Sequence, residues 1–82
     1  MLDVYKLSFV KRSEERKKVF LSLSKPKFPK EIDKEVKLGM NRVSRALNEL
    51  AEQGLVECLN PEDKRGRIYR RTKKGESLVK EL

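Results

Sequence analysis

Four polar side chains gather on one side of a helix that the sequence predicts over residues 41–53. Assigning each residue the usual 100° of helical rotation places them opposite an apolar stripe. The polar set is Asn41, Ser44, Arg45 and Asn48, and the stripe is Val43, Leu47 and Leu50. Amide, hydroxyl and guanidinium groups are the donors and acceptors that read base edges in the DNA major groove. The face therefore predicts a DNA-reading helix, although any solvated surface helix also has a polar side.

Two carboxylates, Glu49 and Glu52, lie towards the other end of the same predicted helix. Phosphate would repel them, whereas the amino end of a helix attracts phosphate through its dipole and its free amides. We expect the amino-terminal half of this helix to face the DNA.

Positive charge is concentrated after this helix. Residues 60–75 contain seven Lys and Arg residues against two acidic ones, and the whole chain of 82 residues carries a net charge of +8. Such an excess of positive charge favours a polyanionic partner. The alternative is that the charged surface serves only to keep the protein soluble. Within the segment, Lys64, Arg65 and Arg67 are placed to reach a phosphate or the minor groove. Further phosphate contacts are predicted for Lys30 and Arg42.

Other classes of function find little support. The chain has no histidine, no glycine-rich phosphate loop and no nucleophile beside a base, so we predict no enzyme and no cofactor. Its single cysteine, Cys58, cannot form an internal disulfide, argues against a zinc cluster, and suits a small buried side chain. No apolar run suggests a membrane span, and no segment supplies an evident ligand pocket. We expect a cytoplasmic protein.

Two helices should precede the polar-faced helix. Ser13 is a suitable N-cap for the first, which continues through an apolar stripe to about Leu23. Pro29 fits the first position of the second, which should run to about Lys37. Gly39 is expected to supply a left-handed C-cap, after which Asn41 should cap the third helix. So short a separation is typical of a helix-turn-helix.

Beyond the third helix, two short segments read as antiparallel strands. They are residues 55–59 and 68–72, joined by the charged turn 60–67, in which proline, acidic residues and glycine favour chain reversal. After Gly75 the chain should form a short last helix. The fold class is therefore mainly α with a small β-hairpin (α+β).

At these residues the sequence resembles the winged helix-turn-helix regulators, in the broad MarR, ArsR and PadR-like group and especially their small archaeal versions. The matching segments are NRVSRALNELAEQGLVE and NPEDKRGRIYRRTKKGE, and the similarity covers residues 13–82. It implies a three-helix core with a wing and a short C-terminal helix, in a DNA-binding transcriptional regulator that is commonly a homodimer. One departure is Arg71, where the family commonly has an aliphatic residue. Its side chain could point outward towards DNA, or the strand could be locally shifted.

The two ends of the chain pose a separate question. Residues 1–12 form an N-terminal extension whose apolar residues suit either a strand or a helix, and the last helix is too short to be stable alone. Both ends must therefore pack against something. We predict that they build a two-fold dimer interface, the alternative being that they only cover the core of residues 13–82.

Two rival functions use the same fold. A winged helix can be a protein-interaction module in a larger complex, and it can bind structured RNA.

Overall fold

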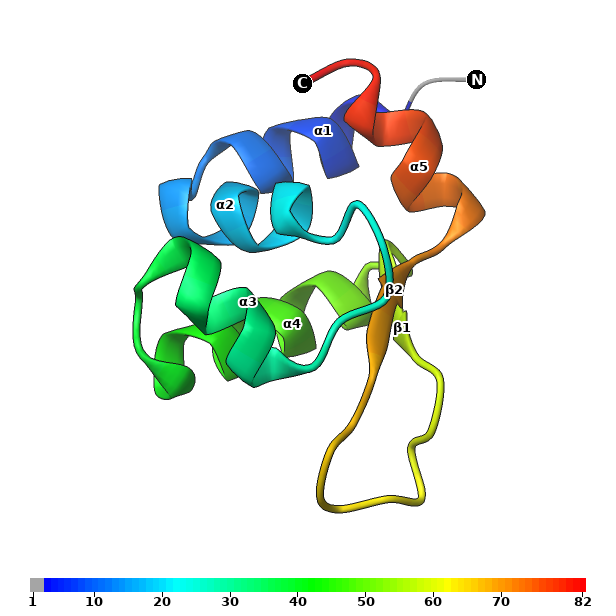
Figure 1. The fold of residues 1–82 in the computed structure, drawn as a ribbon. Coiled ribbons are helices and arrows are strands. Elements are labelled where there is room, and N and C mark those ends of the chain that lie inside the picture. Colours follow the sequence, from blue (N-terminus) through cyan, green and yellow to red (C-terminus); the bar gives the residue numbers. More distant parts are fainter. Residues whose placement is uncertain (1–2) are drawn as a thin grey trace.

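The structure, a computed structural model, describes residues 3–82. This part of the chain forms five helices and a two-stranded sheet. In order they are α1 (Val4–Lys11), α2 (Glu14–Ser22), α3 (Pro29–Val36), α4 (Met40–Glu52), β1 (Val56–Cys58), β2 (Tyr69–Arg71) and α5 (Lys73–Val79). Figure 1 shows α1 and α5 together on one side of the molecule, with the loop between β1 and β2 extending to the opposite side, below α3 and α4.

The N-terminal segment, left open between strand and helix by the sequence, is the helix α1 over residues 4–11. Asp3 caps it by accepting a hydrogen bond from the backbone N–H of Lys6 at 3.1 Å. Ser13 caps α2 in the same way, as predicted, by accepting from the N–H of Arg16 at 3.2 Å. Residues 1–2, part of the predicted extension, lie outside the described residues. A side-chain oxygen at an N-cap satisfies a helix donor that would otherwise lack a partner.

The core lies where α2, α3, α4 and the sheet meet. The predicted stripe of α4 is confirmed, since Val43, Leu47 and Leu50 are at most 1% exposed. Phe20 from α2 and Ile32 from α3 are fully buried beside them. With its apolar stripe held in the core, α4 must turn its opposite side to solvent.

The turn between α3 and α4 differs from the prediction. Lys37, not Gly39, is the left-handed C-cap of α3, with φ of 55°. Gly39, with φ of 94°, is instead the N-cap of α4, so the helix begins at Met40 and Asn41 is its second residue. A positive φ favours glycine at this cap over asparagine, and the carboxylate of Asp33 stabilises the turn by accepting the Gly39 N–H at 2.8 Å.

The predicted hairpin is confirmed, with shorter strands. Val56 pairs with Arg71 and Cys58 with Tyr69 in a regular antiparallel register. Backbone hydrogen bonds continue the pairing beyond both ends of the assigned strands. An unpredicted third segment joins this sheet, because Lys27 exchanges two backbone hydrogen bonds with Tyr69, at 3.0 and 2.9 Å. The connection from α2 to α3 is thereby tied to the hairpin.

Candidate nucleic-acid interface

A groove of about 520 Å³ lies between the start of α3, the amino-terminal half of α4 and the loop 60–67, hereafter the wing. The side chains that matter most in its lining are Lys30, Met40, Ser44, Asn48, Lys64 and Arg67. Five of these six are residues that the sequence singled out. The fold thus brings together polar groups of the helix and cations of the wing that are some twenty positions apart in sequence.

The remaining four predicted residues are exposed but do not line this groove. They are Asn41, Arg42, Arg45 and Arg65. Arg42 makes an ion pair with Glu15 of α2, with Nη1 2.9 Å from a carboxylate oxygen, and both side chains are exposed. Such surface pairs contribute about 0 to 1 kcal/mol, so the guanidinium can exchange partners at little cost.

The wing is shaped by two acceptor residues in its own loop. The side chain of Asn60 accepts from the N–H of Ile68 at 2.7 Å and donates to the carbonyl of Gly66 at 3.0 Å, closing the base of the loop. Asp63 accepts the N–H of Arg65 through its carboxylate and the Nε–H of Arg67 through its backbone carbonyl. Asp63 therefore orders the backbone that presents the arginines of this basic loop.

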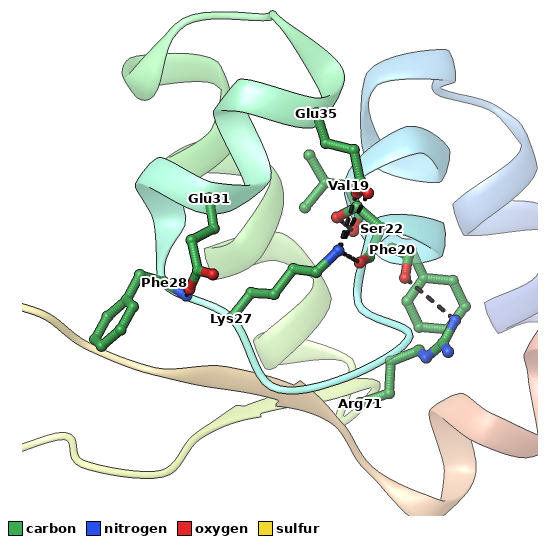
Figure 2. A network of polar contacts seen from close by, with 8 residues as sticks. All are labelled: Val19, Phe20, Ser22, Lys27, Phe28, Glu31, Glu35 and Arg71. Atoms are coloured by element: carbon green, nitrogen blue, oxygen red, sulfur yellow. Dashed lines mark hydrogen bonds and ion pairs between the residues drawn. The ribbon is translucent and has the colours of Figure 1, made fainter.

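A ring and a buried lysine fix the spacing between the wing and α3. Phe28 lies close to Gly66 of the wing, since a Cβ built on Gly66 would be 3.5 Å from the ring of Phe28. Figure 2 shows this ring directed towards the segment that runs from the wing into β2, with the Phe28 N–H bound to the carboxylate of Glu31 at 2.9 Å. Nothing local in the sequence distinguishes Phe28, which lies in the connection between α2 and α3.

The buried lysine is Lys27. Its side chain is buried, donates to the carbonyl of Ser22 at the end of α2, and reaches the carboxylate of Glu35 on α3 at 3.1 Å (Figure 2). A buried ammonium is stable only when paired and hydrogen-bonded, as it is here. With its backbone bound to Tyr69, this residue joins α2, α3 and the sheet.

Both alternatives predicted for Arg71, a side chain that points outward and a locally shifted strand, are wrong. The strand register is regular, and the side chain points inward with only 7% exposure. Its guanidinium donates to the carboxylate of Glu76 at 2.8 Å. It also donates to the carbonyl of Phe20 at 3.4 Å (Figure 2). Arg70 is also paired, with Glu57 at 2.9 Å. The buried guanidinium of Arg71 is therefore not available to a partner, whereas the cations of the loop are exposed.

Glu49, one of the carboxylates of α4, is also paired. Its Oε1 lies 3.4 Å from the guanidinium of Arg16, which in addition donates to the carbonyl of Phe9. This arginine links α1, α2 and α4, and it partly neutralises the carboxylate of Glu49.

Neither a protein-family model nor a curated protein matches this sequence. The similarity of this chain to solved structures shows that it has the winged helix-turn-helix fold.

The similarity is to regulators of the MarR type. The chain is 29% identical to MarR from E. coli, both in the reduced form (TM-score 0.76, 94% of this chain and 59% of that chain) and in a cysteine mutant complexed with operator DNA (TM-score 0.75, 92% and 56%). A mutant of ZitR from Lactococcus lactis shares the fold at 24% identity, with a TM-score of 0.67 over 82% of this chain and 47% of that one. The chain therefore spans less than two thirds of the length of these proteins.

In residues 3–82 no helix is both long enough and apolar enough to cross a membrane. The same residues contain no cluster of three or more histidine, cysteine or acidic side chains suited to a metal ion.

Proposed function

We propose that this protein is a transcriptional regulator that binds double-stranded DNA, with α4 in the major groove and the wing on the backbone or in the minor groove. The observation that carries the proposal is the groove in which Ser44 and Asn48 of α4 face the same space as Lys64 and Arg67 of the wing. The similarity to MarR, solved with operator DNA, supports it. The proposal involves no catalytic step and no cofactor, and a DNA partner implies an intracellular location.

Each candidate residue has a role in this arrangement. Ser44, Arg45 and Asn48 would contact base edges, with Asn41 beside them on the exposed side of α4. The backbone contacts would come from Lys30, Arg42, Lys64, Arg65 and Arg67. Arg42 would leave Glu15 for a phosphate, an exchange between two exposed partners.

Removing the wing cations should reduce the salt dependence of binding. In the variant Arg65→Ala/Arg67→Ala, each lost phosphate contact lowers the slope of log K against log[salt] by about 0.9, because fewer counterions are released. If both arginines contact phosphate, the slope falls by about 1.8. Fluorescence anisotropy with a labelled duplex at several salt concentrations measures it.

The matched control removes two exposed cations from α1 and its C-cap, Lys11→Ala/Arg12→Ala. It should leave the slope nearly unchanged, since Figure 1 places α1 on the side away from the wing. Equal reductions in both variants would show that only net charge matters, and an unchanged slope in the wing variant would remove the wing from the interface.

Competition between nucleic acids separates this function from its rivals. Duplex DNA should displace a labelled duplex at physiological salt more effectively than a structured RNA hairpin or a single strand. Preference for the hairpin would favour RNA binding. Weak binding to all three would favour a protein-interaction module, in which the polar face of α4 contacts a partner protein.

We also propose that the protein is a homodimer formed through α1 and α5. Val4 and Tyr5 of α1 are 67% and 89% exposed, which leaves apolar surface without cover in the described residues. Val79 and Leu82 are half-buried at the other end of the chain, and α1 and α5 lie on the same side in Figure 1. A two-fold axis that passes between these helices and runs along the direction of the wings would direct both wings towards the same DNA.

Sedimentation velocity tests the dimer. The chain should sediment as a dimer at micromolar concentrations, and replacing both exposed residues, Val4→Ser/Tyr5→Ser, should weaken the association. A monomer at high micromolar concentration without DNA contradicts the dimer. In that case the two ends of the chain serve only to cover the core.

A further inference from the structure

The observed start of α4 adds a residue to its groove-facing side. Met40 is the first residue of the helix, and it precedes Ser44 and Asn48 by four and eight positions. Residues four apart lie above one another on a helix surface, and all three line the groove. A thioether therefore heads the row that continues with a hydroxyl and an amide.

Two side chains of the groove lining are apolar and partly exposed. Met40 is 40% exposed, and Phe28, in the same lining, is also 40% exposed. The groove also carries the cations of Lys30, Lys64 and Arg67, which suit a polyanion. A partner that is both anionic and able to cover an apolar group accounts for the two features together.

Duplex DNA offers one apolar group in its major groove, the C5-methyl of thymine. We propose that Met40 is a specificity-determining residue that packs against a thymine methyl when α4 enters the major groove. The inference rests on the proposed function and extends it from binding to base choice. An unbranched thioether side chain adapts well to a small apolar group of this kind.

A methyl deletion in the DNA isolates the contact. A duplex site is first enriched from a random library on the unmodified protein, and each thymine is then replaced singly by deoxyuridine, which lacks only the methyl group. At one or more positions the replacement should weaken binding about fourfold, the value of one buried methyl group. Met40→Ala should bind the thymine site more weakly than the unmodified protein and should no longer distinguish thymine from deoxyuridine at that position.

Two control variants complete the cycle. Met40→Leu keeps an apolar side chain and should retain the distinction. Leu21→Ala removes an apolar side chain of similar exposure, 41%, from α2 outside this groove, and should also retain it. Thermal melting of each variant confirms that it is folded, which is expected because all the substituted side chains are exposed.

The outcomes separate this inference from the function on which it rests. If the protein enriches a duplex site but binds thymine and deoxyuridine equally at every position, the inference is wrong while DNA binding stands. If Met40→Ala keeps the full fourfold distinction, another residue contacts the methyl and the inference is also wrong. If no duplex is retained at any salt concentration, both the inference and the proposed function fail.

Discussion

Gly75→Ala is expected to lower the free energy of unfolding by about 2 kcal/mol. A Cβ at this position would lie 2.2 Å from the backbone carbonyl oxygen of Leu55, a distance at which something must move. Overpacking of this kind costs about 3 kcal/mol at the upper end of its usual range, whereas alanine gains about 1 kcal/mol over glycine inside a helix. Because the obstructing atom belongs to the backbone, we expect the clash to exceed the gain in helix propensity.

Chemical denaturation monitored by circular dichroism measures the effect. Ser77→Ala, an exposed position two residues further along α5, is the control and should change stability by less than about 0.5 kcal/mol. A Gly75→Ala variant as stable as the parent would mean that α5 does not pack against Leu55 as closely as the structure shows.

Arg45→Ala is expected to weaken DNA binding by about 1 to 3 kcal/mol and to relax the base preference at one position. The residue is exposed on the polar side of α4, next to Ser44 of the groove lining. A guanidinium at such a place can donate two hydrogen bonds to the O6 and N7 atoms of guanine, and losing them removes both affinity and discrimination. Titrations against an enriched site and its single-base variants measure both quantities.

Arg45→Lys keeps the charge and loses the planar pair of donors, so it should relax base preference with a smaller loss of affinity. Arg12→Ala, an exposed arginine at the end of α1, should alter neither quantity. An equal loss for Arg45→Ala on every sequence would show that this residue contacts only the backbone of the DNA.

Local patterns predicted most of the fold. The apolar stripe of Val43, Leu47 and Leu50 predicted which side of α4 is buried. The burial of these three side chains confirms the helical periodicity. Ser13 marked the beginning of α2 because capping depends on neighbouring residues only. The hairpin followed from the turn-forming residues of 60–67 between two short strand-like segments. In each case the determining interactions are close in sequence.

Two of the features that the sequence did not predict depend on contacts between distant residues. The pairing of Lys27 with Tyr69 joins a connection to a strand more than forty positions away. Arg71 points inward because Glu76 and the carbonyl of Phe20 are there to accept its hydrogen bonds. Met40 was missed for a local reason, because capping preference favoured Asn41 over a glycine with positive φ.

The candidate site was predicted in part. The polar side of α4 could be derived from helical periodicity, and the wing cations from the concentration of charge. That the polar side of α4 and the arginines of the wing form one surface could only be proposed from the sequence, because it depends on how the hairpin packs on the helices. In the structure Ser44 and Asn48 share a groove with Lys64 and Arg67. The close approach of Phe28 to Gly66 helps to fix that packing.

The central claim is that the amino-terminal half of α4 and the wing form one surface for duplex DNA. Amide chemical shifts of the ¹⁵N-labelled protein, followed by NMR while an enriched duplex is added, test it in a single titration. Residues 40–48 and 63–67 should shift together, with the same apparent Kd. Shifts confined to α1 and α5, or an unperturbed wing beside a perturbed α4, would contradict it.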